Sequence, residues 1–560
     1  VHATGCYTSK AEMKNLNRRN EWMLGSAETV SLMSDRLGGI AYPSYMIDNG
    51  WKRIIWHQFH DDLTGTSIPE AYLYSYNDEY ITLRQMRSVI ESAVASVAGV
   101  MDTRAKGKAV MVYNPISSVN SSVAEAEIEL PAGIRSVNVI GPDGRKVRSQ
   151  IIARSGDRAT VAFAGKNPSL SLSVYDFRPS ANAEESSSKL KAEGNVLENA
   201  VYRITFDANG DMCSVIDKRC GRELVKEGCA FGLEFFGDNV SEEWPSWEIM
   251  REVMERTPGK VGGEVKLTVE ECGPLRACMR VDRKHAGSTF TQKIYLTDGA
   301  VDDRIDVVNT VDWRSGASLL KASFPVSFDA PEASYDMGMG HISRGNNTDI
   351  QYEVFAHQWA DVTSTDGKYG VTVMNDSKYG WDKPDDHTLR LTLLHTPGVG
   401  KGYTEQSTQD MGVHTFTYSI VGHPAALDPA KADIDSDCIN QAQMAFGTDS
   451  HKGAIGKVYS MASTTTPDLR IKAFKKAQDG DGIVIRVYEM TGKGSEGQVV
   501  FNSPIVSAEE LNGIEDSKGP ATFRGNALDV KSSGFALKTY RVRLAEPGVS
   551  IPSREYTSVS

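Results

Sequence analysis

The hydrophobic period of this chain changes once, near residue 104, and that change constrains the fold more than any other feature. Before it, apolar residues recur every three or four positions within residues 9–33, 45–60 and 73–101, which predicts three long helices. After it, short apolar runs separated by Gly and Pro turns predict strands to the end of the chain. The expected fold class is therefore multidomain α+β: an antiparallel three-helix bundle followed by large antiparallel β-sandwich domains.

Four domains are expected along the chain. The bundle takes residues 1–104, and a small β-sandwich domain takes residues 105–180. The Ser-, Ala- and Glu-rich stretch 180–194 is interpreted as an exposed linker. The many short strands that follow, over 195–430, exceed what one small sandwich uses and predict a large or double sandwich, a supersandwich. Residues 428–437 are interpreted as a crossing into a C-terminal β-domain over 431–560.

Charge and composition narrow the function classes. The net charge of −12, without a basic stripe, argues against a nucleic-acid partner and fits a neutral glycan. No apolar run reaches the roughly 20 residues that span a membrane, so no membrane partner is expected. The first residue, Val1, suggests a piece of a longer precursor, which leaves the compartment unknown.

The cysteines are dilute. Seven are present and none forms a Cys-x-x-Cys pair, so reduced and mostly buried thiols are expected. A disulfide among Cys213, Cys220 and Cys229 stays open on spacing alone.

Polar side chains gather where the second predicted helix ends and the third begins. His57, His60, Asp61 and Asp62 lie here, followed by Gly65. Such a junction suits metal and sugar sites. The competing interpretation is structural, because a His near a helix C-terminus is favoured by the helix dipole and Asp-Asp is ordinary turn chemistry.

The string Gln-Phe-His-Asp-x-Leu-x-Gly-Thr-Ser-Ile, at residues 58–68, closely resembles the motif that ends the catalytic region of family 38 glycoside hydrolases, the retaining α-mannosidases. Other stretches resemble family landmarks in the same order, from residue 2 to about 544; they include residues 5–9, 112–115, 216–224, 311–313, 319–325 and 375–380. The resemblance implies a zinc-dependent hydrolase of terminal α-mannosyl residues of glycans.

The resemblance implies roles for two residues, and a third candidate comes from a turn. His60 matches a zinc ligand of the family, and Asp61 matches a residue that contacts the sugar. Tyr379 is a further candidate for substrate binding, because it lies in a polar and aromatic turn and aromatic faces stack on sugar rings. A hairpin turn with a packed Tyr is the competing interpretation.

The chain also departs from the family pattern. None of its eleven histidines begins the His-x-Asp-x-Gly-Trp string of the family's α/β domain. We therefore expect no catalytic residue within this chain: the nucleophile, the acid/base and most zinc ligands belong to an N-terminal α/β catalytic domain of the same enzyme. The expected partners are that domain and a mannose-containing glycan, and a homo-oligomer stays open. Alone, the chain is expected to be inactive and not to retain zinc.

Other interpretations remain open. The chain is alternatively a non-catalytic carbohydrate-binding or scaffold module, or a different retaining glycosidase with paired acids in its strands. A weak local zinc site of His57, His60, Asp61 and Asp62 is conceivable, although His57 packed within the bundle and Asp62 solvated or capping the next helix are favoured. The glycines at 398, 400 and 402 lack the strand-to-helix setting of a phosphate loop. If a catalytic domain covers the His60 end, apolar side chains should be exposed there.

Overall fold

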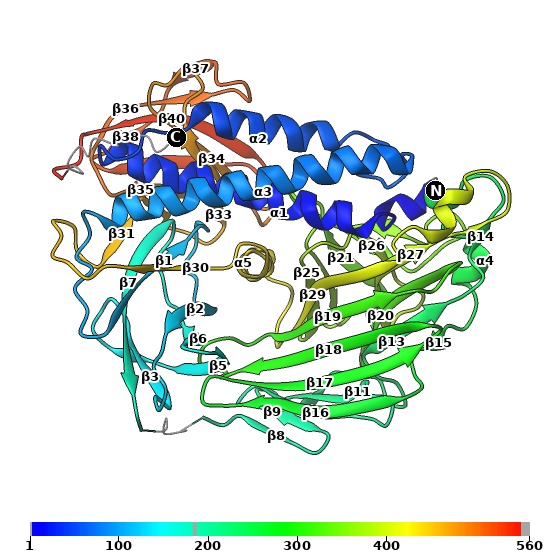
Figure 1. The fold of residues 1–560 in the computed structure, drawn as a ribbon. Helices are drawn as coiled ribbons and strands as arrows, with labels where there is room; N and C mark the ends of the chain where they lie inside the picture. Colours follow the sequence, from blue (N-terminus) through cyan, green and yellow to red (C-terminus); the bar gives the residue numbers. More distant parts are fainter. Residues whose placement is uncertain (1–2, 183–187, 550–560) are drawn as a thin grey trace. The chain divides into compact units, whose positions relative to one another are not determined.

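The computed structural model describes residues 3–182 and 188–549 (Figure 1). Its contacts divide the chain into two compact units. Unit 1 comprises residues 1–19, 53–80 and 186–428, and unit 2 comprises residues 20–52, 81–185 and 429–560. Each unit is therefore assembled from segments that are distant in sequence.

Three long helices occupy the region where the apolar spacing predicts them: α1 (Ala11–Arg36), α2 (Ser44–His57) and α3 (Pro69–Ala98). Helix α3 begins at Pro69, whose fixed φ suits the first helical position. Each helix contributes residues to both units. Within unit 1, Tyr80 of α3 donates a hydrogen bond to Glu12 of α1 over 2.9 Å. Within unit 2, the Trp51 indole of α2 donates to Glu28 of α1 over 3.2 Å.

Unit 1 is mostly β-sheet. Its largest sheet has nine strands, in the order β16 (Val265–Cys272), β17 (Arg276–His285), β18 (Ser288–Thr297), β19 (Ile305–Trp313), β29 (Gly412–His423), β25 (Gly370–Asn375), β24 (Trp359–Thr363), β21 (Glu332–Asp336) and β22 (His341–Gly345). A six-stranded sheet has the order β15 (Gly259–Lys260), β13 (Gly232–Phe236), β20 (Ser318–Pro325), β27 (Thr388–Thr396), β26 (Gly380–Asp382) and β23 (Val354–Phe355). Five strands form a third sheet: β12 (Arg222–Glu223), β11 (Met212–Asp217), β10 (Tyr202–Phe206), β9 (Val196–Glu198) and β8 (Lys191–Glu193).

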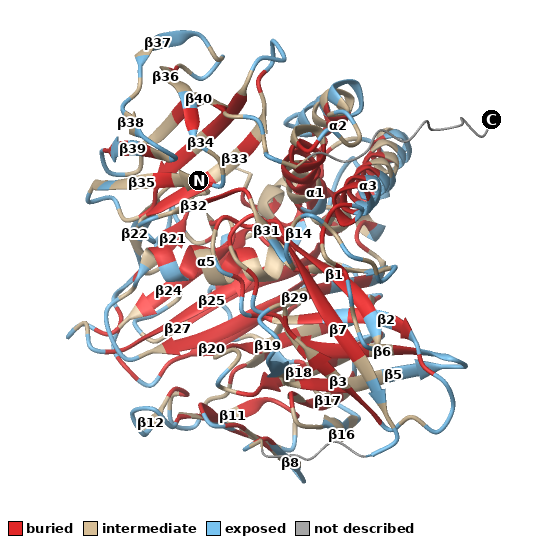
Figure 2. Ribbon diagram, turned by 90° about the vertical axis from the view of Figure 1, so that its left-hand side faces the viewer, coloured by how far each residue is buried: buried red, intermediate tan, exposed pale blue. Residues whose placement is uncertain are grey.

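One hydrophobic core joins these sheets. Phe324 of β20 in the six-stranded sheet packs edge-on against Tyr418 of β29 in the nine-stranded sheet, with ring centroids 5.6 Å apart. The ring of Phe231, directly before β13, also packs edge-on against Phe324, with centroids 5.7 Å apart. Central strands β20 and β27 are buried along nearly their whole length (Figure 2). Both strands nevertheless mix apolar and polar residues, Ser-Leu-Leu-Lys-Ala-Ser-Phe-Pro in β20 and Thr-Leu-Arg-Leu-Thr-Leu-Leu-His-Thr in β27, so their buried polar side chains need partners in the interior.

Unit 2 contains two smaller β-assemblies. In the first, β30 (Met444–Thr448), β1 (Lys108–Asn114), β7 (Ser171–Ser180), β3 (Ser136–Ile140) and β4 (Lys146–Val147), with β31 (Val458–Ser460) on β7, share a core with β2 (Val123–Glu129), β6 (Arg158–Ala164) and β5 (Ser149–Ser155). The second contains β33 (Leu469–Lys476), β34 (Ile483–Glu489), β40 (Leu537–Leu544), β36 (Ile505–Leu511) and β37 (Ser517–Pro520), and beside them β32 (Ala462–Thr464), β35 (Ser495–Phe501), β39 (Ala527–Ser532) and β38 (Phe523–Arg524).

Two stretches interpreted as connections contain regular structure. The predicted crossing at 428–437 contains most of helix α5 (Pro429–Asn440), and the chain passes here from unit 1, which ends at residue 428, into unit 2, which resumes at residue 429. The buried residues of α5 are mainly Ala, Ser and Asp, so it lacks the apolar stripe that reveals a helix, and Asp437 pairs with the buried Arg470. The predicted linker 180–194 contains strand β8, and its residues 183–187 lie outside the described part of the chain.

None of the seven cysteines forms a disulfide, and Cys278 alone is buried, so the expectation of mostly buried thiols is wrong. Among the described residues, no helix is long and apolar enough to cross a membrane.

Candidate functional site

His60 and Asp61 lie in the irregular turn that connects α2 to α3. The His60 side chain is 78% exposed, and its Nε2 lies 3.8 Å from Asp61 Oδ2. Asp61 is fixed by its backbone: its carbonyl accepts hydrogen bonds from the amides of Thr66 at 3.0 Å and Ser67 at 2.8 Å. The imidazole therefore faces solvent while the backbone beneath it is held.

Hydrogen bonds among buried polar side chains hold this turn against the helices. The His57 ring is buried and bonds through Nδ1 to Asp62 over 2.7 Å and through Nε2 to Asp78 over 3.3 Å. Ser75 of α3 donates to both oxygens of Asp62. Burial alone would lower the pKa of His57, but the two carboxylates outweigh it and the pKa is raised.

The hydrogen bonds of His57 and Asp62 test two sequence expectations. His57 is buried and hydrogen-bonded among the helices, as expected. Asp62 is buried as well, so the expectation that it is solvated or caps the next helix is wrong; its carboxylate accepts hydrogen bonds from His57 and Ser75.

Apolar side chains surround His60 on the surface. Trp56 is 77% exposed, Phe59 55% and Ile68 61%, and the Phe59 ring lies 4.1 Å from the His60 ring. Soluble proteins seldom expose large apolar residues in groups, so this end of unit 1 has the character of a contact surface. The expectation of exposed apolar side chains beside His60 is met.

Tyr379 lies in the loop between β25 and β26 and is almost fully buried. Arg18 of α1 donates to its phenol oxygen over 3.0 Å and lies 4.7 Å from its ring centroid. Phe355 stacks on the same ring at 5.8 Å with an interplanar angle of 9°. The His357 ring also lies near the Tyr379 ring, with centroids 5.9 Å apart, so Tyr379 is closely packed and its side chain has little exposed surface.

The N-terminal segment links the turn to the Tyr379 loop. Gln58, at the end of α2, donates to Asn17 of α1 over 3.1 Å, one residue before Arg18. The carboxylate of Asp61 helps to raise the pKa of Cys6, although burial is the main reason that it reaches about 11. Tyr7, next to Cys6, packs against Phe355 with centroids 6.2 Å apart.

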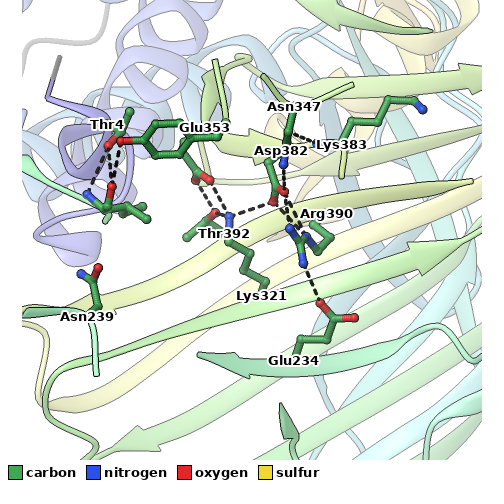
Figure 3. Close-up of polar contacts among 12 residues, drawn as sticks. Thr4, Glu234, Asn239, Lys321, Asn347, Glu353, Asp382, Lys383, Arg390 and Thr392 are labelled. Atoms are coloured by element: carbon green, nitrogen blue, oxygen red, sulfur yellow. Dashed lines mark hydrogen bonds and ion pairs between the residues drawn. The ribbon is translucent and has the colours of Figure 1, made fainter. Parts of the chain in front are cut away.

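A buried ion cluster joins strands β20, β26 and β27 of the six-stranded sheet to Glu353, the residue before β23 (Figure 3). Lys321 Nζ contacts Glu353 at 2.5 Å and Asp382 at 2.9 Å, and all three side chains are fully buried. Arg390 pairs with Asp382 over 2.5 Å. Burial raises the pKa of Glu353 to about 7 against the attraction of Lys321, whereas Arg390 and Lys321 overcome burial and hold the pKa of Asp382 at about 2.

Gly380 joins this cluster to the N-terminal segment. A Cβ at this position would lie 2.5 Å from Glu353 Oε1 and 2.8 Å from the Thr8 hydroxyl, so only Gly fits. Glu353 of the cluster therefore lies against the residue that follows Tyr379.

Other residues of the predicted polar turn have structural contacts, which agrees with the competing interpretation that this stretch is a packed hairpin turn. Asp376 accepts from the Thr417 amide over 2.8 Å. The ammonium of Lys378 lies 4.2 Å from the Phe416 ring centroid. Trp381 is fully buried.

His60 can supply one metal ligand. Its imidazole is exposed, and nitrogen of His is a preferred zinc donor. Across residues 3–182 and 188–549, no three His, Cys, Asp or Glu side chains come together as a ligand set. The local zinc site of His57, His60, Asp61 and Asp62 is thus not formed, because His57 and Asp62 bind each other in the interior.

Comparison with known protein families identifies the family to which this chain belongs. Residues 2–97 match the alpha mannosidase middle domain, residues 197–399 match the glycosyl hydrolases family 38 C-terminal domain, and residues 468–540 match the C-terminal beta sandwich domain of that family. The chain belongs to glycoside hydrolase family 38. The first match contains the His60 turn, and the second contains both Tyr379 and the ion cluster.

Relatives in family 38 are recognisable along nearly the whole chain. Alpha-mannosidase 2C1 of Mus musculus is 25% identical over 557 residues, and alpha-mannosidase G of Dictyostelium discoideum is also 25% identical, over 604 residues. These matches cover 97% and 96% of this chain but 50% and 51% of the relatives. The chain thus spans about half the length of the curated relatives it matches. The crystal structure of an alpha-mannosidase from Enterococcus faecalis V583 has the same fold, with a TM-score of 0.80 at 16% identity, covering 97% of this chain and 68% of that one.

Sequence reasoning missed several residues that hold the candidate site in place. Arg18 and the Lys321 cluster were not proposed as site residues, although charged residues inside otherwise apolar runs are a signal. Lys321 lies in the run Ser-Leu-Leu-Lys-Ala-Ser-Phe-Pro, where a charge needs a buried partner.

Proposed function

We propose that this chain is the helical and β-sandwich part of a zinc-dependent retaining α-mannosidase that hydrolyses terminal α-mannosyl residues of glycans. The observation that carries the proposal is the solvent-exposed His60–Asp61 pair on a backbone held from below, within a chain of family 38. An α/β domain of the same enzyme supplies the nucleophile, the acid/base and the other zinc ligands. The exposed apolar side chains beside His60 support the docking of that domain.

In this proposal, the chain's own residues bind and orient. His60 would hold zinc through its imidazole, and the bound metal would supply Lewis-acid chemistry towards the hydroxyls of the sugar. Asp61 accepts a hydrogen bond from a sugar hydroxyl, and Tyr379 contributes to binding the same ligand. The retaining reaction needs two carboxyl groups about 5 Å apart across the sugar, and these come from the α/β domain.

The proposal includes a domain plan. Residues 1–104 form an antiparallel three-helix bundle, followed by β-domains over 105–180, 195–430 and 431–560. The Tyr80–Glu12 and Trp51–Glu28 hydrogen bonds support the bundle, because each joins α1 to one of the other two helices.

Hydrolysis of a nitrophenyl α-mannoside tests the function. The chain is assayed with zinc, alone and after mixing with the α/β domain that the proposal requires. Activity is expected only on mixing, and His60→Ala should abolish it. His451→Ala, at a partly exposed histidine whose ring bonds to a backbone carbonyl, is the matched control and should keep it. Zinc-dependent hydrolysis by the chain alone would overturn the proposal and point to a catalytic site in the β-domains.

A further inference from the structure

Three aromatic rings form an exposed cluster in unit 1, which we call the aromatic platform: Trp244, Trp247 and Tyr403. The ring centroids lie 5.5 Å apart for the two Trp, 5.9 Å for Trp244 and Tyr403, and 5.4 Å for Trp247 and Tyr403. Trp244 is 42% exposed and Tyr403 39%. The largest aromatic side chains of the core, in contrast, are fully buried. Burial alone therefore does not explain why these three rings lie together.

Two approaching backbone segments hold the platform. Strands β14 (Val240–Ser241) and β28 (Gly398–Val399) pair in parallel, and each leads into a segment that carries the rings. A Cβ at Gly398 would lie 2.6 Å from Val240, and one at Gly400 would lie 2.9 Å from the Glu242 backbone. The glycines at 398 and 400 therefore serve this close approach rather than a phosphate loop.

Buried polar contacts fix the short helix between the two Trp residues. This helix, η2, comprises Pro245–Trp247. The amide of its second residue, Ser246, donates a hydrogen bond to the Gln406 side chain over 2.9 Å. The Ser246 hydroxyl also bonds to Gln409 over 2.5 Å. Gln406 belongs to η3 (Thr404–Thr408), directly after Tyr403, so the two ring-bearing segments are bonded to each other.

Tyr403 adopts a strained backbone conformation. Its φ is 47° and its ψ is 39°, in the left-handed region that a bulky residue rarely occupies. Such strain persists only where the surroundings hold it, and it gathers at ligand sites. Here it places the phenol ring against both indoles.

Hydrophilic side chains border the rings. Glu242 and Glu243 precede Trp244, and Lys401 lies two residues before Tyr403. Lys401 Nζ pairs with Glu242 over 3.1 Å, and both side chains are more than half exposed. Exposed aromatic rings with charged residues next to them in the chain suit the mixed surface of a sugar, whose C–H faces stack and whose hydroxyls bond.

The platform and the His60 turn share one anchor, the N-terminal segment. The Ser9 hydroxyl donates to the Ser246 carbonyl over 2.7 Å, and the Ser9 carbonyl accepts from Lys14. Lys14 Nζ also donates to the Leu63 carbonyl, in the His60 turn, over 2.9 Å. Both surfaces are therefore fixed to the same segment of unit 1.

We propose that the aromatic platform binds pyranose rings of an oligosaccharide by stacking, as a subsite separate from the His60–Asp61 pair. The choice of mannose as the sugar rests on the proposed function. The site itself rests on the three rings, their rigid mounting and their polar border.

Binding of a linear α-mannotriose to the intact chain without zinc tests the proposal, with Trp fluorescence and saturation-transfer NMR as readouts. Trp244→Ala and Tyr403→Gly should each weaken binding at least about tenfold. Tyr403→Gly is the decisive variant, because Gly prefers the local backbone conformation and the fold should be kept. Trp244→Phe should restore most of the affinity. Tyr45→Ala, at an aromatic side chain that is 79% exposed on α2, is the matched control and should bind normally.

Unchanged mannotriose binding in Trp244→Ala and Tyr403→Gly would overturn the proposal. So would the absence of saturable binding by the wild-type chain, which would assign the exposed rings to contact with another domain. His60→Ala should keep trisaccharide binding while it abolishes hydrolysis in the mixed enzyme. The platform and the proposed function can therefore fail independently of each other.

Discussion

Arg18 and Tyr379 are 361 positions apart in the sequence, yet the guanidinium of one both donates to the phenol oxygen of the other and lies over its ring. Arg18 also donates to the His357 carbonyl over 2.8 Å. The pair ties helix α1 to the Tyr379 loop of the large β-region. The position of a candidate sugar-binding residue thus depends on a helix residue far away in the chain.

Replacing Arg18 should release this loop. Arg18→Met removes charge-assisted hydrogen bonds from a buried position, and we expect it to lower the free energy of unfolding by about 2–3 kcal/mol. Urea denaturation followed by circular dichroism measures the change. Arg87→Met, which removes an exposed pair with Glu91, should change stability by less than about 0.5 kcal/mol. Equal effects of the two substitutions would contradict the structural role of Arg18.

The hydrogen bonds of His57 should make stability depend on pH. The pKa of His57 is raised in the folded state, so its contribution is fully present below the unfolded pKa of about 6.5 and is lost as the pH rises through the higher folded pKa. The difference in unfolding free energy between wild type and His57→Gln should therefore be larger at about pH 6 than at about pH 9. A pH-independent His57→Gln difference would refute this role of His57.

Breaking the buried ion cluster should be costly. Lys321→Met leaves Glu353 and Asp382 buried without their shared cation, and we expect a loss of about 3–5 kcal/mol. Adding Glu353→Gln should recover part of the loss, because Glu353 is the carboxylate that loses its cation, whereas Asp382 still pairs with Arg390. Chemical denaturation of the two variants measures both effects. Lys284→Met, at an exposed pair with Glu264, should be nearly neutral, and a similarly neutral Lys321→Met would contradict the cluster's role.

Gly380 offers a steric test of the contact between the loop and the cluster. Gly380→Ala would force its methyl group against Glu353 and Thr8, and a loss of about 1–3 kcal/mol is expected. Gly447→Ala, also at a strand position but with no atom within 4 Å of the added Cβ, should be tolerated. Thermal unfolding of both variants separates the clash from a general cost of losing Gly in a strand.

Local patterns in the sequence predicted the elements that depend on local physics. The three-four spacing of apolar residues located α1, α2 and α3, and Pro69 marked the start of α3. The motif at residues 58–68 located the exposed His60–Asp61 turn. Helix α5 was missed because its buried face is small and polar, so no apolar stripe marks it.

Contacts between residues that are distant in the chain could not be predicted from the sequence. Nothing local shows that Arg18 meets Tyr379, that Lys321 meets Glu353, or that Trp244 meets Tyr403, because each pair joins separate elements through the tertiary fold. Burial of a charge inside an apolar run indicates that a partner exists, but it does not say which one.

The left-handed backbone of Tyr403 creates a conflict between stability and ligand binding at one position, because the residue that suits this conformation best, Gly, has no aromatic ring. Gly would relieve a strain of about 1–2 kcal/mol there, and it would delete the ring in the same step. Selection of variants for heat resistance alone should therefore enrich Gly at residue 403, whereas selection for retention on an immobilised oligosaccharide should keep Tyr.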